Sequence, residues 1–300
     1  MSENLQASDT PLVVASRHGR MDEAAALIES GADVNEPTTD VIGASPLIVA
    51  CFGGHIQTAS LLIEKGAAVN QATIHGGMTP LFAACGHQHF AIVSLLLSSG
   101  ADVNLAEDMG ATPLTVACTR GNLACVQLIS SHGAGRTFPR GSTAERIAGR
   151  CNHEEVFNWL VATRLWSTPL HHLTIIDATR ARELLRGGAD LHAAAAADGP
   201  TPLSLARELH TAGNAAEGTA AHLVLRAAGR WSEQTHELFP AVVRARAAEL
   251  MLLGHRFSRQ EGFLNKEVAI FDAWMHHVMP FAIERDLSPE SPLMADLEAA

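Results

Sequence analysis

The sequence predicts an all-α fold: a solenoid of helix–turn–helix repeats with short hairpin loops and a helical cap at its C-terminal end. A Thr-Pro-Leu or Ser-Pro-Leu triplet begins at residues 10, 45, 79 and 112, so its spacings are 35, 34 and 33 residues. A cluster of Leu and Ile follows each triplet, and a Gly-Ala pair then closes each unit. One such unit cannot bury its own apolar face, whereas a stack of units can.

Each position of this repeat has a physical role in a pair of helices. The Thr or Ser caps the first helix, and Pro follows at the N1 position, where its missing N–H costs nothing. The alanine at offset five from the Thr lets two helices approach closely, and a Gly or His break at offset nine or ten turns the chain. The Leu cluster is the buried stripe of the second helix. The closing Gly-Ala pair ends that helix before a turn rich in Asp and Asn.

This pattern resembles the ankyrin repeat family, and the resemblance extends over residues 1–230 as about seven repeats. The last three repeats are degenerate. Residues 143–161 lack the Pro-Leu pair, and residues 168–192 form a repeat that is one residue short. The repeat that opens at Thr201 contains a polar insertion at residues 213–218.

Beyond the repeats, the C-terminal segment predicts further helices. Residues 240–254 carry apolar positions at helical spacing between a Pro and a Gly, and residues 261–285 carry a longer apolar series. Because a solenoid needs its terminal apolar face covered, we expect residues 231–285 to form a helical cap. Residues 286–300 are expected to be an acidic tail.

Composition and charge narrow the classes of function. Hydrophobic residues make up 47% of the chain and the mean hydropathy is +0.10, which indicates a folded protein. The net charge of -11 argues against binding to nucleic acid or to anionic membranes. No uncharged apolar run approaches the ~18 residues of a membrane span, and the first residues do not resemble a signal peptide. We therefore expect a cytoplasmic or nuclear protein that is a monomer on its own.

The histidines and cysteines invite a catalytic or metal-binding interpretation. His55, His89 and His153 share offset ten, where we expect them to form hydrogen bonds between repeats. Cys51 shares offset six with Cys85 and Cys118, and we expect small, reduced core residues there. The sequence contains no His-Glu-x-x-His or Cys-x-x-Cys spacing. We expect no metal, no cofactor and no catalytic residue.

The resemblance implies a concave surface, made of hairpin tips and the inner faces of the first helices, that binds a partner protein. The scaffold leaves free the positions one, three and four before the Thr and seven and eight after it. Phe52 and Met78 are apolar where solvent is expected, and Arg120 is of a type favoured at interfaces. Residues 1–135 carry 4 basic and 12 acidic side chains, so we expect a partner with basic and apolar surface. The candidate contact residues are Val41, Ile42, Phe52, His75, Met78, His87, Asp108, Met109, Thr119 and Arg120.

Three alternatives remain open. The chain could be an adaptor whose C-terminal helices dock to a larger complex, such as a ubiquitin ligase. It could be an enzyme with a site in those helices. The basic stretch of Arg136, Arg140, Arg146 and Arg150 could bind an anion or an acidic peptide, although a solvated surface is the favoured interpretation.

Overall fold

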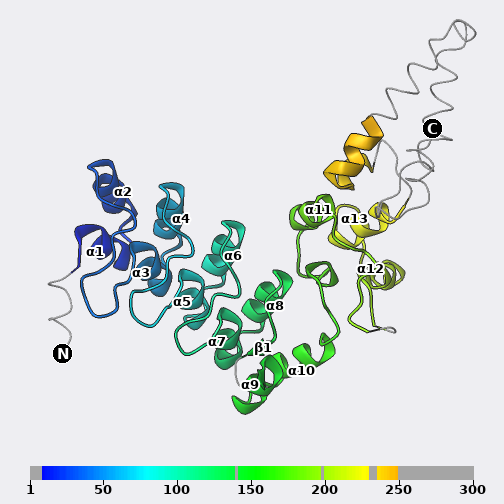
Figure 1. Cartoon of the computed structure of the whole chain (residues 1–300), viewed down its shortest axis with the longest axis horizontal. Coiled ribbons are helices and arrows are strands. Elements are labelled where there is room, and N and C mark those ends of the chain that lie inside the picture. Colours follow the sequence, from blue (N-terminus) through cyan, green and yellow to red (C-terminus); the bar gives the residue numbers. More distant parts are fainter. Residues whose placement is uncertain (1–8, 139–140, 197–198, 230–234, 249–300) are drawn as a thin grey trace, which may run out of the picture. The chain divides into compact units, whose positions relative to one another are not determined.

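The chain divides into two units, residues 1–164 and residues 165–300. The computed structural model describes residues 9–138, 141–196, 199–229 and 235–248. In the described part of the first unit, the helices follow one another in five pairs (Figure 1). These pairs are α1 (Pro11–Arg17) with α2 (Met21–Glu29), α3 (Pro46–Gly53) with α4 (Ile56–Glu64), α5 (Pro80–Gly86) with α6 (Phe90–Ser98), α7 (Pro113–Arg120) with α8 (Leu123–Ser131), and α9 (Ala144–Arg150) with α10 (Glu154–Ala162).

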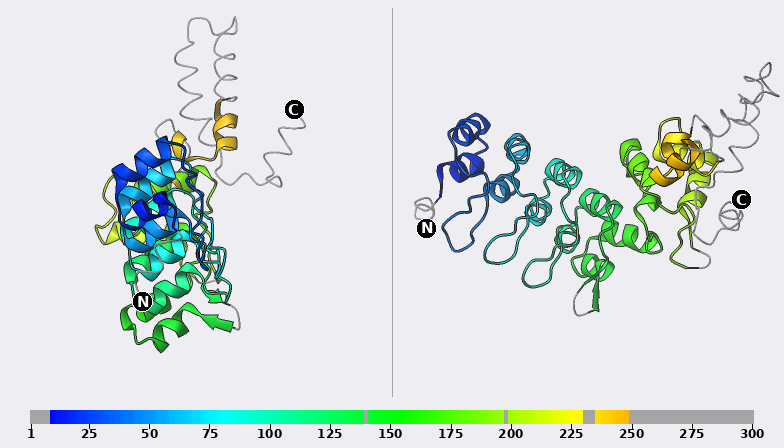
Figure 2. Two further views of the ribbon diagram at one scale, coloured as in Figure 1. Left: turned by 90° about the vertical axis from the view of Figure 1, so that its left-hand side faces the viewer. Right: turned by 45° about the horizontal axis from the view of Figure 1, so that its top comes forward.

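Successive pairs stack so that the first helices form one row and the second helices form another (Figure 1, Figure 2). Helix α3 packs on both α1 and α5, while α4 packs on both α2 and α6. A loop connects each pair to the next and projects beyond the row of first helices. Before the fifth pair, this loop contains the antiparallel strands β1 (Thr137–Phe138) and β2 (Ser142–Thr143). The predicted helical repeat architecture is confirmed.

The residues that open each repeat cap the first helices as predicted. The side-chain oxygens of Thr10, Ser45, Thr79 and Thr112 each accept a hydrogen bond from the backbone N–H three residues later, at 3.2–3.4 Å. Thr143 caps α9 in the same way at 3.3 Å, although the Pro-Leu pair is missing there. Such a cap stabilises a helix by about 1 kcal/mol, so each short helix begins at a position that the sequence specifies.

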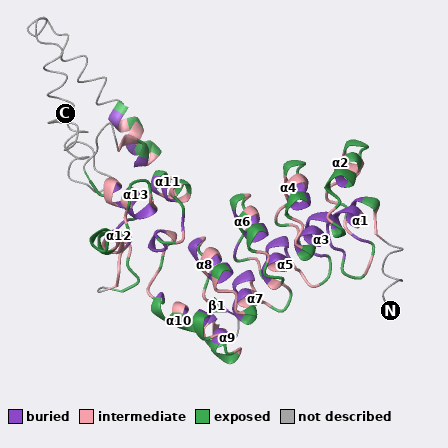
Figure 3. Ribbon diagram, turned by 180° about the vertical axis from the view of Figure 1, so that it is seen from behind, coloured by how far each residue is buried: buried purple, intermediate pink, exposed green. Residues whose placement is uncertain are grey.

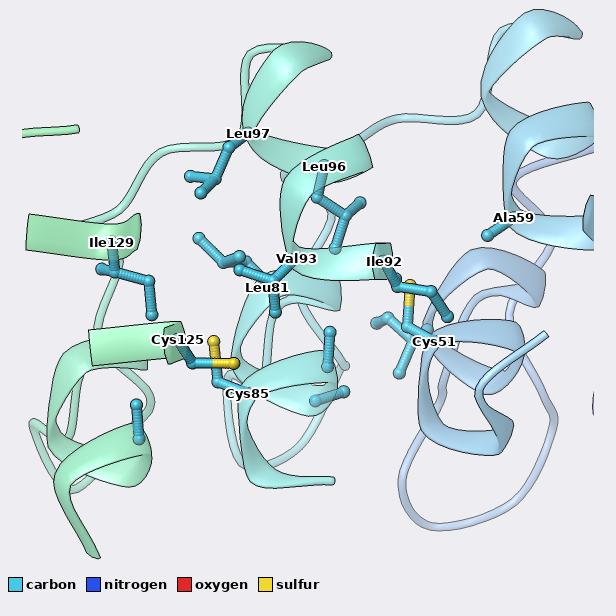
Figure 4. Packing of buried hydrophobic residues seen from close by; sticks show 14 of the residues in the cluster. Cys51, Ala59, Leu81, Cys85, Ile92, Val93, Leu96, Leu97, Cys125 and Ile129 are labelled. Atoms are coloured by element: carbon cyan, nitrogen blue, oxygen red, sulfur yellow. The ribbon is translucent and has the colours of Figure 1, made fainter. Parts of the chain in front are cut away.

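The core of the first unit lies between the two rows of helices (Figure 3). Leu47, Leu81 and Leu114 are at most 1% exposed, and the alanine three residues after each of them is fully buried. These alanines bring neighbouring first helices together, because they have almost no side chain to separate the backbones. Figure 4 shows the third repeat's part of this core, where residues of α5 and α6 meet those of α8. They include Leu81, Cys85, Val93, Leu96, Cys125 and Ile129.

Four of the five cysteines belong to this core as small apolar residues. Cys51, Cys85 and Cys118 are fully buried in consecutive repeats, and all five cysteines are free thiols. Burial raises the pKa of Cys51 and Cys85, and it raises the pKa of Cys118 to about 12. A thiol with a raised pKa carries little thiolate at neutral pH and is a poor nucleophile.

The histidines at offset ten bridge successive repeats, which confirms their predicted role. The Nε2 atoms of His55, His89 and His153 lie 2.9–3.2 Å from backbone oxygens near the end of the preceding repeat's first helix. Asparagines after the second helices make a parallel series of bridges. Asn35 Oδ1 accepts from Ala68 N at 2.8 Å, and the Oδ1 atoms of Asn70 and Asn104 accept equivalent bonds from Asp102 N and Gly135 N at 2.9 Å. Within the described residues, the first two junctions between repeats therefore have both kinds of bridge, whereas the third has only the asparagine bridge of Asn104 and the fourth only the histidine bridge of His153.

Arg136 has a structural role that the sequence analysis did not foresee. Its guanidinium donates to the backbone oxygens of Leu160 and Thr163 at 3.3 and 2.9 Å and lies 5.3 Å from the centre of the Trp159 ring. It therefore closes the C-terminal end of α10, where the helix dipole favours a cation. Burial lowers the pKa of Arg136. The guanidinium of Arg136 is occupied by these contacts within the fold. It is therefore not the free anion-binding group that the basic stretch of residues 136–150 could have supplied.

The second unit has helices and a hydrophobic core of its own. The sixth repeat begins with a 3₁₀ turn, η2 (Pro169–His171), in place of a full first helix, and continues with α11 (Ala178–Arg186). The seventh repeat consists of α12 (Pro202–Thr211) and α13 (Ala220–Ala227). His171 is 1% exposed, and its Nε2 lies 3.0 Å from the backbone oxygen of Pro200. This hydrogen bond and the shared hydrophobic core join the sixth and seventh repeats.

The described beginning of the C-terminal segment packs onto the second unit. It contains a 3₁₀ turn, η3 (His236–Leu238), and helical residues 241–248. Leu238 is fully buried in the second core, and η3 packs on α11. Arg186 Nε donates to the backbone oxygen of Glu237 at 3.0 Å. The predicted helices of residues 261–285 and the predicted tail of residues 286–300 lie outside the described residues.

Candidate functional site

The site is built on the loops that connect repeats one to four. Each loop is closed by a backbone hydrogen bond of 2.9 Å across its base. These bonds run from Thr38 N to Ala44 O, from Thr73 N to Met78 O and from Glu107 N to Ala111 O. The loops also bond to one another, from His75 N to Ile42 O and from Asp108 N to Gly76 O, both at 3.2 Å. The loop row is therefore a hydrogen-bonded structure whose tips have fixed positions.

A pocket of about 270 Å³ lies between the loop of residues 38–44, the next loop and helix α3. Its buried lining comprises Ala44, Ile48 and Val49 together with the hydroxyl-bearing Thr38 and Thr73. Its more exposed lining comprises Ile42, Phe52 and Met78, with Asp40, Arg17 and Gly53 completing the wall. The pocket is thus mostly apolar, with one carboxylate and one guanidinium at its edge.

Asp40 holds its loop together and keeps its negative charge. Its Oδ1 accepts hydrogen bonds from Thr38 Oγ1 at 2.5 Å, from Gly43 N at 2.9 Å and from Ile42 N at 3.1 Å. Partial burial disfavours the charged form, but these three bonds and the nearby charge of Arg17 together outweigh burial, and the pKa of Asp40 is lowered. The carboxylate is therefore ionised at neutral pH and its position is fixed by its donors.

The charge of Arg17, which also lines the pocket, is balanced within the same repeat. Arg17 Nη2 lies 2.5 Å from Asp9 Oδ2, so these two residues form an ion pair. The pair and Asp40 together carry one net negative charge. The pocket edge is therefore acidic, in agreement with the acidic balance of residues 1–135.

Several of the predicted contact residues come together here. Ile42, Phe52 and Met78 line the one pocket. The ring of Phe52 contacts the ring of His87, with centroids 3.9 Å apart. Burial, followed by the charges of His89 and Arg120, lowers the pKa of His87. The aromatic surface thus continues from the pocket toward the fourth repeat.

The other predicted residues lie away from the pocket or are engaged in the fold. Val41 and Met109 are 83% and 91% exposed on their loops and do not line it. Asp108 Oδ2 accepts a hydrogen bond from Gly76 N at 3.0 Å, which links two loops. The Thr119 hydroxyl donates to Thr115 O at 2.9 Å within α7. Asp108 and Thr119 therefore both make contacts within the repeat stack.

The sequence analysis missed the polar part of the pocket. Arg17 lies seven positions after Thr10, at the same offset as Phe52 after Ser45, so extending the pattern to the first repeat would have found it. Asp40 and Thr38 gave no signal, since their importance depends on the conformation of a loop. That loop is one residue longer than the next, because Thr38 pairs with a residue six positions away and Thr73 with one five positions away.

Within the described residues, no three His, Cys, Asp or Glu side chains gather as ligands for a metal ion. No helix in that part of the chain combines the length and apolarity that a membrane crossing requires.

Comparison with known families agrees with this geometry. A family model described as ankyrin repeats in three copies matches residues 12–107, and one described as an ankyrin repeat matches residues 109–137. Residues 12–137 are ankyrin repeats. Ankyrin repeats are generally protein–protein interaction modules and are typically not enzymatic. No curated protein matches the chain.

Proposed function

We propose that this chain is an interaction scaffold or adaptor whose ankyrin repeats bind a partner protein through the loop row and the adjoining faces of the first helices. One observation carries the proposal. The three most exposed large apolar side chains of the described ankyrin segment are Val41, Ile74 and Met109, at 83%, 64% and 91%. Each lies on a different one of three successive loops. Exposed apolar groups aligned on a preorganised surface favour binding to another protein.

The charge of the segment supports a particular kind of partner. Residues 1–135 hold 4 basic and 12 acidic side chains, a net charge of -8. Such a surface attracts partners that present basic groups, and the attraction mostly increases the rate of association. We therefore propose a partner with basic groups around an apolar centre.

For the C-terminal segment, we propose a capping role in preference to docking or catalysis. Leu238 and Phe239 are at most 1% exposed, and the Glu237 carboxylate forms ion pairs with Arg182 and Arg186 of α11. Apolar side chains of this segment that are buried against the second unit are not available to contact a partner. This role extends the predicted cap of residues 231–285 from its described beginning.

The test uses the full chain as bait in extract from its native cell. The double variant Phe52→Ala with Met78→Ala removes apolar groups from the proposed surface. The matched control, Ile56→Ala with Phe90→Ala, removes similar groups from the first turns of α4 and α6 in the same two repeats. We expect at least one protein to be recovered about tenfold less with the first variant and equally with the control. Equal recovery with both variants would contradict the proposal.

A further inference from the structure

We propose that the pocket beside Asp40 takes one bulky apolar side chain of a partner segment, and that a Lys or Arg next to this side chain contacts the Asp40 carboxylate. This inference rests on the proposed function, because it names the part of the partner that the loop row recognises. Asp40 is not among the contact residues predicted from the sequence, and the ankyrin repeat pattern assigns it no role.

The size and lining of the pocket favour a side chain over a small molecule. Its volume of about 270 Å³ is below the range of roughly 300–1,000 Å³ that is usual for pockets of drug-sized ligands. Ile48 and Val49 are buried at its base, and Ile42 and Phe52 are 46% and 47% exposed at its mouth. A bulky side chain that enters would cover these exposed groups, which is how anchor residues fill pockets at interfaces.

The charge at the edge selects a basic neighbour. Asp40 is ionised, and its Oδ1 is held by three donors from its own loop. Arg17 is the basic side chain on the pocket wall, and it is paired with Asp9. A cation that approaches Asp40 therefore meets a net negative charge, whereas an anion there would have to compete with Asp9 for Arg17.

The pocket is also preformed. The loop that forms one wall is closed by bonds from Thr38 N to Ala44 O and from Ala44 N to Thr38 Oγ1, at 2.9 and 2.8 Å. The neighbouring loop is closed through Thr73 in a similar manner. A partner therefore does not have to order these loops when it binds, which lowers the entropic cost of association.

The test pans a phage library of random peptides against the immobilised full chain. We expect the selected peptides to share a Phe, Trp, Leu or Met with a Lys or Arg close beside it. The best peptide is then synthesised and its dissociation constant measured by fluorescence anisotropy. Phe52→Ala is expected to weaken binding about tenfold, whereas the control Phe90→Ala, with 46% exposure against 47%, should change it less than twofold.

A double-mutant cycle tests the charge contact separately. Asp40→Asn keeps a side-chain oxygen as acceptor and removes the charge. It is expected to weaken the basic peptide about threefold and to leave unchanged a peptide in which Gln replaces the basic residue. Glu29→Gln, an exposed charge removal on α2, should affect both peptides equally.

Several results would overturn the inference. They are a library without binders, selection of acidic peptides, and an Asp40→Asn effect that is the same for both peptides. Peptides that respond to Arg120→Ala but not to Phe52→Ala would place the contact elsewhere on the loop row. In that case the pocket inference fails while the proposed function stands, since the proposed function depends on the capture experiment above.

Discussion

At three junctions between repeats, a glycine at the end of the first helix leaves room for the histidine ring of the next repeat. Gly54 has φ +78°, and a Cβ there would lie 2.6 Å from the His89 ring. Gly19 faces His55 and Gly121 faces His153 in the same way. At the junction between the third and fourth repeats, both the glycine and the histidine are replaced. Gln88 takes φ +62° at the position of the glycine, and the next repeat has Asn122 in place of histidine.

The structure gives the magnitude of this coupling. In Gly54→Ala, the left-handed conformation costs a non-glycine residue about 1–2 kcal/mol. The ring of His89 must also move, which weakens or breaks its hydrogen bond to Phe52 O. Such a bond contributes about 0.5–1.5 kcal/mol to stability. We therefore expect a loss of about 2–3 kcal/mol. Gln88→Gly removes the cost of the left-handed conformation at residue 88, and no histidine ring lies opposite. Glycine also increases the entropy of the unfolded chain, which offsets part of this gain. The free energy of unfolding should therefore rise by at most about 1 kcal/mol.

A double-mutant cycle between Gln88→Gly and Asn122→His isolates the steric term. Asn122 caps α8 through its Oδ1, which accepts from Cys125 N at 3.0 Å, and losing this cap costs about 1 kcal/mol. That cost occurs in both backgrounds and cancels in the cycle. We expect Asn122→His to be at least about 1 kcal/mol less harmful in the Gln88→Gly background.

Native-state hydrogen exchange of the amides in α6 and α8 measures the cycle locally, since a repeat stack need not unfold in one step. Circular dichroism of each variant checks that the helices are retained. Additive effects, within about 0.5 kcal/mol, would refute the steric explanation of why glycine precedes each of these histidines.

Three further outcomes follow from the contacts. Arg136→Met should lower the local stability of α10 by about 2 kcal/mol in hydrogen exchange, because two backbone oxygens lose a charged donor; unchanged protection would contradict its role. Asn70→Ala should cost about 1–2 kcal/mol in urea unfolding, because Asp102 N loses its acceptor at 2.9 Å, and no loss would show that water replaces it. Folding raises the pKa of Cys118 to about 12 and of Cys125 to about 11 from 9.0. Between pH 9 and pH 11 the unfolded chain therefore loses protons that the folded chain retains, so the free energy of unfolding should fall as pH rises, by up to about 1.4 kcal/mol per unit for each thiol. Replacing both cysteines by Ala should reduce this slope.

The sequence predicted those parts of the fold that depend on residue type at a fixed offset. Thr10 and its equivalents cap helices, the offset-five alanines are buried, and His55 bridges two repeats, because each role needs one kind of side chain at one place. The pocket depends instead on how a loop folds. Thr38 and Asp40 shape that loop through bonds to backbone groups that only the folded conformation brings near them. Arg136 was missed for the same reason, since it meets α10 some 24 to 27 residues later in the chain.

The demands of the fold also bear on where the proposed partner would bind. Buried positions of the helices are occupied by the core, and the asparagine and histidine bridges use the polar positions that face the next repeat. The stack does not require the exposed apolar side chains of the loop row, because the loops are held by backbone bonds and by the side chains of Thr38, Asp40, Thr73 and Asp108. Substitution of Ile42 or Phe52 can therefore change the partner without removing a bond that the stack requires. This separation allows the exposed side chains at the mouth of the Asp40 pocket to be apolar without serving the fold, so their substitution should alter the proposed recognition more than it alters stability.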